Sequence, residues 1–314
     1  MTEPLWIERY RPRTVEDCIL PDRIKAKLKS FVDARLIPNL LLTGSAGVGK
    51  TTAAKAMIRD VGGDDFFINA SLHGNIDTLR TEITQFASAR SFSGGRKYVI
   101  LDEADHLNAQ STQPALRAFM EEYSGNCGFI LTCNFPYKII EPLRSRLVEV
   151  PFQVLPEEEP YVMAAFMKRV KGILDENGIP YEAPVVADVI RRNFPDLRKT
   201  LNTIHQYSYH GRIDSGVLSK TPATEVLVKE LVGLMRSKDF QGMVKWCATN
   251  RHIEAHELMR KVYDQMYDHF TPSTIPLVVV KTADYMYKSA FAADQEINTL
   301  AWLTELMMDA KFRD

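Results

Sequence analysis

Short runs of apolar and β-branched residues recur through the first half of the chain and are separated by longer segments. In these segments, for example Thr51–Arg59 and Thr112–Tyr123, the apolar residues follow helical spacing. Near-continuous apolar strands that alternate with helices are typical of a parallel sheet that is buried on both faces. The pattern therefore predicts an α/β domain over residues 1–152. The predicted strands are Asn39–Thr43, Phe66–Ala70, Tyr98–Asp102, Gly128–Asn134 and Leu147–Phe152.

After Pro151 the apolar residues follow helical spacing only, so the predicted fold class is α/β followed by all-α. Proline-containing breaks at 178–180 and 194–196 divide residues 153–215 into a small three-helix unit. A second helical block, residues 220–314, begins near Thr221 and Pro222, a capping residue and a proline suited to the first helical turn. Its apolar positions are dense over 225–235, and further helices are predicted at His256–Phe270, Ser273–Tyr287 and Asp294–Ala310.

Composition excludes several classes of protein. No apolar stretch approaches the roughly 20 residues that span a bilayer, and the first residues lack the apolar core of a secretion signal. The four cysteines form no close pair, which argues against a zinc knuckle or a disulfide framework. A cytoplasmic location, in the host cell if the protein is viral, and no membrane partner are therefore expected. The net charge of −1 means that any DNA contact must be a local basic patch.

A glycine-rich loop follows the first predicted strand and opens a predicted helix. Its spacing, Gly44-x-x-x-x-Gly49-Lys50-Thr51, fits the phosphate-binding loop of nucleoside triphosphatases. Glycines let backbone N–H groups face phosphate oxygens, the lysine reaches the β- and γ-phosphates, and the threonine hydroxyl binds Mg²⁺. The predicted cofactors are therefore ATP and Mg²⁺. The predicted nucleotide-binding residues of this loop are Gly44, Gly47, Val48, Gly49, Lys50, Thr51 and Thr52.

The strand Tyr98–Asp102 ends in two acidic residues, as in the Walker B motif that accompanies such loops. Asp102 is predicted to hold Mg²⁺ together with Thr51, and Glu103 to polarise the attacking water. ATP hydrolysis is the expected activity. Asp105 completes a DEAD string, but the other helicase motifs are not apparent, so the string is interpreted as the end of Walker B.

These motifs follow an N-terminal segment, Trp6-Ile7-Glu8-Arg9-Tyr10-Arg11-Pro12, that completes a family resemblance. The chain resembles AAA+ ATPases of the sliding-clamp-loader small-subunit type, and among them the ATPase subunits of T4-like bacteriophages. The resemblance implies a P-loop AAA+ parallel-sheet domain, a helical lid domain and a C-terminal helical collar domain. It also implies that Tyr10, Arg11 and Pro12 lie against the adenine base, with Ile19 and Leu20 contributing to the same pocket.

The resemblance also implies catalytic roles outside the two Walker motifs. Residues 130–134 are similar to the sensor 1 strand, in which Asn134 would orient the attacking water. Residues 142–147 are similar to the motif that carries the arginine finger, so Arg146 would act on ATP held by a neighbouring subunit; Leu147 replaces the usual cysteine. Residues 194–199 resemble sensor 2, with Arg198 contacting the γ-phosphate. A surface ion pair is the alternative role for either arginine.

Primer–template DNA is the expected nucleic-acid partner, because family members follow its backbone with helix N-termini. The matching segment places Asn75, Ile76 and Arg80 at the DNA. Whether Arg90, Arg96 and Lys97 add a DNA-facing charge or form a solvated loop stays open. Gln113 and Arg117 could link the ATP site to DNA or to the next subunit.

The implied function is that of an ATP-dependent sliding-clamp loader. ATP binding would open the clamp and place it on primer–template DNA, and hydrolysis stimulated by DNA and clamp would release it. The implied partners are further copies of the chain and a different subunit in a ring-like pentamer, the sliding clamp, and DNA. Two alternatives are a non-catalytic scaffold subunit and another AAA+ DNA motor such as a branch-migration helicase.

Overall fold

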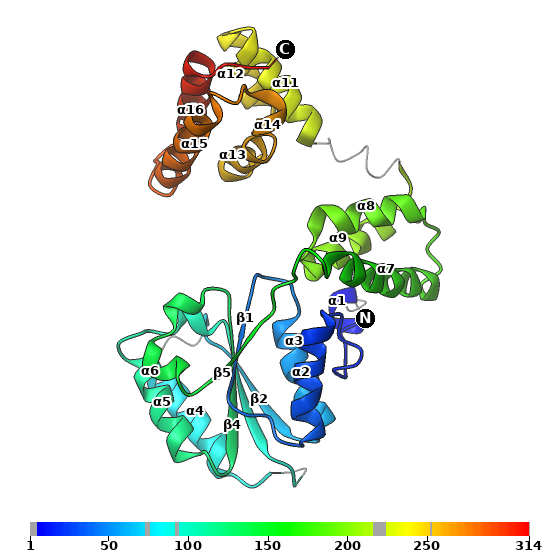
Figure 1. Ribbon diagram of the computed structural model, residues 1–314, viewed down its shortest axis with the longest axis vertical. Helices are drawn as coiled ribbons and strands as arrows, with labels where there is room; N and C mark the ends of the chain where they lie inside the picture. Colours follow the sequence, from blue (N-terminus) through cyan, green and yellow to red (C-terminus); the bar gives the residue numbers. More distant parts are fainter. Residues whose placement is uncertain (1–4, 73–75, 92–93, 216–223, 252, 314) are drawn as a thin grey trace. The chain divides into compact units, whose positions relative to one another are not determined.

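The computed structural model describes residues 5–313, apart from 73–75, 92–93, 216–223 and 252. The chain forms two compact units, Met1–Asp214 and Ser215–Asp314, which are described separately below (Figure 1). Within the described residues no helix is long and apolar enough to cross a membrane.

Unit 1 is built on a parallel sheet that has five strands among the described residues, in the order β2-β3-β4-β1-β5. The central strand β4 and its neighbours β3 and β1 are buried along nearly their whole length. The edge strands β2 and β5 are partly exposed. The predicted parallel α/β domain is thus confirmed. The strands are β1 (Leu40–Thr43), β2 (Asp64–Asn69), β3 (Lys97–Asp102), β4 (Cys127–Cys133) and β5 (Val148–Pro151).

Helices cover both faces of the sheet, and two apolar clusters fill the space between (Figure 1). Alternate strand residues face opposite clusters, as the two-residue period of a strand requires. Leu40 and Leu42 pack toward α2 and α3, and Leu41 packs toward α4, α5 and α6. The helices are α2 (Asp22–Asp33), α3 (Lys50–Asp60), α4 (Ile76–Ser88), α5 (Thr112–Glu122) and α6 (Glu141–Arg144), with short 3₁₀ turns η1 (Ala104–His106) and η2 (Pro136–Lys138).

A bundle of three longer helices, α7 (Glu159–Glu176), α8 (Ala183–Asn193) and α9 (Leu197–Ser208), completes unit 1. The short N-terminal helix α1 (Trp6–Arg9) packs on it, because the buried Trp6 ring stacks on His205 of α9 at a centroid distance of 4.6 Å. Asp196 caps α9 by accepting a hydrogen bond from the Lys199 backbone N–H at 2.8 Å. The N-terminal segment is thereby held against the last helix of the bundle.

Unit 2 is all-α, and its core surrounds the fully buried Trp302 and Phe270. The single helix predicted over His256–Phe270 is wrong, because the chain leaves helical geometry at Gln265 and resumes it only for one turn. The predicted start at Thr221 and Pro222 lies outside the described residues. The helices are α11 (Thr224–Arg236), α12 (Phe240–Thr249), α13 (Ala255–Asp264), α14 (Met266–His269), α15 (Ile275–Ser289) and α16 (Gln295–Asp309).

Candidate nucleotide-binding site

The carboxyl ends of β1, β3 and β4 meet at one edge of the sheet, where a cavity of about 180 Å³ opens. Parallel α/β sheets bind ligands at this edge, because loops and helix N-termini converge there. The cavity is lined by the N-terminal segment, by the loop between β1 and α3, by the ends of β3 and β4, and by the helices α7 and α9. It therefore combines a phosphate-binding loop with walls from both the sheet and the bundle.

Lys50 is the first residue of α3, and its ammonium group lies inside this site with the residue only 8% exposed. Its Nζ donates hydrogen bonds to the carbonyls of Gly44 and Ser45, both at 2.7 Å, and to Oδ1 of Asn134 at 2.9 Å. Burial lowers the pKa of Lys50, since it disfavours the charged form. A polyanionic phosphate would compensate for this cost by restoring charge stabilisation to the ammonium.

Thr51, which directly follows the loop, contacts Asp102 at the end of β3. The Thr51 hydroxyl donates to Oδ1 of Asp102 at 2.5 Å, and within the described residues Oδ2 of Asp102 receives no hydrogen bond. Hydroxyl and carboxylate oxygens are hard ligands of the kind that Mg²⁺ prefers, usually with water and phosphate completing the shell. No cluster of three or more His, Cys, Asp or Glu side chains able to hold a metal occurs in the described part of the chain. The residues present therefore fit Mg²⁺ bound together with a nucleotide.

Glu103 adopts a left-handed backbone conformation, with φ 57° and ψ 43°, directly after β3. This conformation costs a non-glycine residue about 1–2 kcal/mol, so the surrounding structure must support it. Its backbone N–H donates to the Thr132 hydroxyl at 3.1 Å. Within the described residues its carboxylate makes no hydrogen bond or ion pair, and it lines the cavity. The acid is thus turned out of the strand and left available to water.

Asn134 follows β4 and is held by a buried acid. Its backbone N–H donates to Oδ1 of Asp105 at 3.3 Å, and Asp105 is 5% exposed. Gln113, which is fully buried, donates to the carbonyls of Leu107 and Lys138 and accepts from the Ile140 N–H at 2.8 Å. Gln113 therefore joins the segments that follow β3 and β4 inside the domain, whereas Arg117 is exposed on α5.

The predicted base-binding residues Tyr10, Arg11, Pro12, Ile19 and Leu20 all line the cavity. Side chains of the α7–α9 bundle, the expected lid, share this wall and were missed from the sequence. They project from α7 and α9 with helical spacing, but that spacing alone did not separate them from ordinary core positions. The missed wall residues are Phe166, Arg169, Ile173, Leu197 and Leu201.

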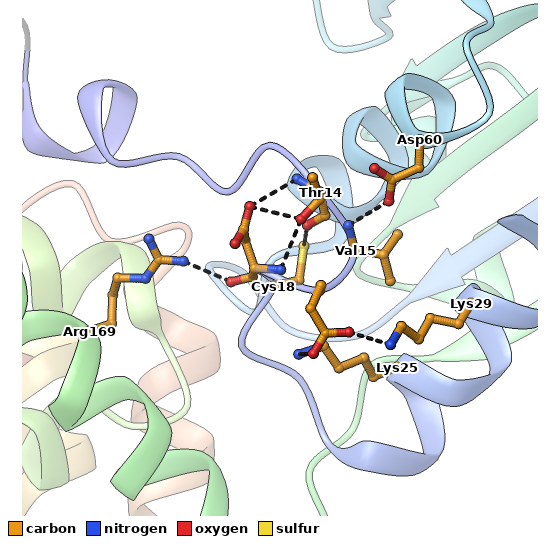
Figure 2. Close-up of polar contacts among 9 residues, drawn as sticks. Thr14, Val15, Cys18, Lys25, Lys29, Asp60 and Arg169 are labelled. Carbon is orange, nitrogen blue, oxygen red and sulfur yellow. Dashed lines mark hydrogen bonds and ion pairs between the residues drawn. The ribbon is translucent and has the colours of Figure 1, made fainter.

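Residues 14–18 bridge the helices α3 and α7 (Figure 2). Val15 N–H donates to Asp60 at the end of α3 at 2.8 Å, and Arg169 of α7 donates to the Asp17 carbonyl at 2.9 Å. Cys18 follows, and burial raises its pKa to about 12. Cys133, the last residue of β4, is also buried, and its pKa is likewise raised to about 12. These hydrogen bonds fix the loop whose next residues line the base side of the cavity.

The lid touches the phosphate loop directly. The Leu197 N–H at the start of α9 donates to the Gly47 carbonyl at 3.2 Å, and Arg198 also lines the cavity. Gly47 has a φ of +75°, and a Cβ on it would lie 1.8 Å from Oδ1 of Asp196. Only glycine fits this contact between loop and lid.

Replacing Gly47 with Ala is expected to weaken nucleotide binding about tenfold or more, because the Asp196 carboxylate must turn away from the loop and would lose its capping hydrogen bond to α9. The measurement is the Kd of a fluorescent ATP analogue. Gly62→Ala is the matched control, since Gly62 has a similar φ of +68° but open space around its Cβ position. Gly62→Ala should lose stability and keep its affinity; equal affinity in both variants would contradict the expected clash.

Three predicted site residues lie away from the cavity wall. The Val48 side chain is buried in the core, so only its backbone could face a nucleotide. Gly44 contributes a carbonyl to Lys50. Arg146 bonds through Nε and Nη2 to Oε1 of Glu121, at 2.8 and 2.6 Å, and through Nη1 to the Pro142 carbonyl at 2.7 Å. The Arg146 guanidinium therefore does not contribute to the cavity of its own chain.

The predicted DNA-facing residues are only partly described. Asn75 lies outside the described residues, and Ile76 begins α4, but its side chain is not described. Arg80 is exposed one turn later. Lys97 is 2% exposed, and its ammonium donates to the carbonyls of Phe86 and Ala89 at the end of α4, so it adds no surface charge.

The Arg96 guanidinium also bonds to a backbone carbonyl, because its Nη2 donates to the Ser124 carbonyl at 2.8 Å. Arg90 is exposed. Of the three cations whose role stayed open, Lys97 and Arg96 thus stabilise the ends of neighbouring segments, and Arg90 alone is fully on the surface.

Residues 40–153 match the family model of ATPases associated with various cellular activities (AAA), and residues 158–219 match that of the sliding-clamp-loader large subunit, AAA+ ATPase lid domain. In solved structures, the Holliday junction branch migration motor RuvB of Thermotoga maritima gives a TM-score of 0.55 at 15% identity, covering 76% of this chain and 85% of RuvB. At that identity the likeness shows the fold alone.

Relatives found by sequence identify the family more narrowly than the likeness in fold does. The sliding-clamp-loader large subunit of Enterobacteria phage T4 is 34% identical over 94% of this chain and 93% of its own length, and that of Escherichia phage RB69 is 32% identical over 98% and 96%. The replication factor C small subunit of Methanothermobacter thermautotrophicus is 33% identical over 82% and 77%. The resemblance stated from the motifs is confirmed. The chain belongs to the AAA+ ATPase subunits of sliding-clamp loaders.

Proposed function

We propose that this chain uses ATP binding to open a sliding clamp and to bind primer–template DNA, and that hydrolysis stimulated by both then releases the clamp. The observation that carries the proposal is the division of the catalytic groups. Lys50, Thr51, Asp102 and Glu103 converge on one cavity, whereas Arg146 lies outside it and is anchored to the surface residue Glu121. A site of this kind would be completed by a second subunit, which suits a machine that hydrolyses ATP only when assembled on its targets.

In this mechanism the lysine binds the β- and γ-phosphates after exchanging its carbonyl partners for phosphate oxygens. Bound Mg²⁺ would be held by Thr51 and Asp102 and would neutralise charge on the phosphates. Glu103 would take a proton from the attacking water, which Asn134 would orient through its side chain. Arg198 from the lid would contact the γ-phosphate, and Arg146 of a neighbouring copy would stabilise the transition-state charge.

The proposed assembly is a ring-like pentamer of several copies of this chain with one different subunit, acting with the sliding clamp in the cytoplasm of the cell in which it replicates DNA. In it, residues 1–152 would form the ATPase domain, 153–215 the lid and 220–314 the collar that joins subunits. The start of α4 would follow the DNA backbone, with Asn75 and Ile76 offering N–H groups and Arg80 a cation.

The decisive experiment measures ATP turnover of the assembled complex alone, then with primer–template DNA, and then with DNA and the cognate clamp. We expect each addition to raise the rate, and the DNA-dependent part to fall steeply with added salt, because phosphate contacts release counterions. A rate that neither DNA nor clamp changes would overturn the loader function. Absence of turnover with intact nucleotide binding would favour the scaffold alternative.

The same turnover experiment with an Arg80→Ala variant tests whether Arg80 contacts the DNA. The variant should need more DNA for half-maximal stimulation and should show a shallower salt dependence. Arg191→Ala, which removes an exposed arginine from α8, serves as the matched control. Equal DNA dependence in the two variants would remove Arg80 from the interface.

A further inference from the structure

Thr132 lies on the central strand β4, between β3 with its acidic end and β1, which leads into the phosphate loop. In the sheet register Leu131 pairs with Leu101 and Thr132 pairs with Leu42. Thr132 is therefore adjacent to the point at which β3 ends, and it is 2% exposed. Its position gives its hydroxyl access to the acidic pair from inside the sheet.

The hydroxyl makes two hydrogen bonds, and both go to that pair. It donates to Oδ1 of Asp102 at 2.6 Å and accepts from the backbone N–H of Glu103 at 3.1 Å. Since a hydroxyl has one proton and two lone pairs, one group can serve both partners at once. A single side chain thus contacts the proposed metal-binding carboxylate and the backbone of the proposed base.

Other buried threonines show what an ordinary structural hydroxyl does in this chain. Thr200 and Thr299 each donate to the carbonyl four residues earlier, at the start of their own helix, at 2.8 Å. Thr282 has no hydrogen-bond partner within the described residues. The Thr43 hydroxyl of β1 donates to Glu149 of β5 at 3.4 Å. Thr132 differs from these threonines because both of its bonds end on residues of the site.

We propose that Thr132 is the positioning residue of the acidic pair, orienting Asp102 for Mg²⁺ and holding Glu103 in its left-handed turn. Oδ1 of Asp102 receives both the Thr132 and the Thr51 hydroxyl protons. This leaves Oδ2 to face the water shell of the metal. The Glu103 N–H, which leaves the strand ladder at this turn, is satisfied by the same hydroxyl.

The inference rests on the proposed use of Mg²⁺ and ATP at this site. The test is binding of a fluorescent ATP analogue over a series of Mg²⁺ concentrations, with ATP turnover measured in parallel. Thr132→Val keeps the shape but removes the hydroxyl. We expect it to need about tenfold more Mg²⁺ for tight binding and to lose about 10- to 100-fold in kcat, with metal-free binding unchanged. Thr132→Ser should stay within about threefold of the unmodified chain on both measures.

Thr282→Val is the matched control, because it removes a buried hydroxyl that has no hydrogen-bond partner in the described part of the chain, and its melting temperature calibrates the cost of the change. Thr132→Ala replaces Thr132→Val if a methyl group against the Asp102 carboxylate prevents folding. An unchanged Mg²⁺ dependence and kcat in the hydroxyl-free variant, or an equal loss in Thr132→Ser, would overturn the inference. If nucleotide binding by the unmodified chain does not depend on Mg²⁺, the proposed use of Mg²⁺ and ATP, on which the inference rests, is wrong instead.

Discussion

Glu103→Gln is expected to lower the rate of ATP hydrolysis by about 10²- to 10⁴-fold while nucleotide binding is retained. The carboxylate lines the cavity and makes no hydrogen bond or ion pair within the described residues, so the amide removes basicity and little else. The phosphate loop, Lys50 and Thr51 are untouched by the change. The measurements are kcat in the presence of DNA and clamp, and the Kd of a fluorescent ATP analogue.

Glu122→Gln provides the control, because Glu122 is an exposed acid at the end of α5 and lies outside the cavity. It should match the unmodified chain on both measures. Full turnover by Glu103→Gln would show that another group activates the water, and the role proposed for Glu103 would then be wrong.

Arg146→Ala is expected to lower hydrolysis by the assembled complex about 10³-fold or more, with nucleotide binding by the single chain unchanged. The reason is that Arg146 does not line the cavity of its own chain, so its proposed partner is ATP held by a neighbouring subunit. Its ion pair with Glu121 is partly exposed, and such pairs contribute only about 0–1 kcal/mol. The pair is therefore weak enough for a neighbouring triphosphate to displace it.

Mixing two inactive variants separates action in trans from action within one chain. In a complex of Arg146→Ala and Glu103→Gln chains, one kind of interface has an intact Glu103 on one side and an intact Arg146 on the other. Part of the turnover should return when the two are assembled together. Complexes that form but stay inactive would argue that Arg146 works within its own subunit or is purely structural.

The strands and the phosphate loop could be predicted because their signals are local. Apolar runs locate β1, β3 and β4 to within a residue or two, and the Gly49-Lys50-Thr51 spacing identifies the loop without knowledge of the fold. Among the helices that were not predicted, α2 and α12 differ in the signal that the sequence offered. In α2 the apolar residues Ile24 and Leu28 lie four apart, so helical spacing was present in the sequence and could have been used. The helix α12 gives a weaker signal, because it is short and contains an interior glycine, Gly242, which lowers helix propensity.

The supporting residues of the site could not be predicted, because they depend on register and on contacts between distant segments. Thr132 becomes informative only when Leu131 is known to pair with Leu101. The steric requirement at Gly47 depends on Asp196, which lies almost 150 residues further along the chain. Lys97 was wrongly expected at the surface because it is charged. Its ammonium is buried and donates to a carbonyl at the end of α4.

Buried cysteines make the chain a convenient subject for spectroscopy. All four cysteines are free and buried, and burial raises the pKa of Cys127 and Cys247 to about 11 and that of Cys18 and Cys133 to about 12. The reactive thiolate form of each cysteine is therefore strongly disfavoured at neutral pH. A single cysteine introduced at an exposed lid position such as Tyr161 would react with a fluorophore far faster than the native thiols. Lid movement can thus be followed without first removing any natural cysteine, two of which line the nucleotide cavity itself.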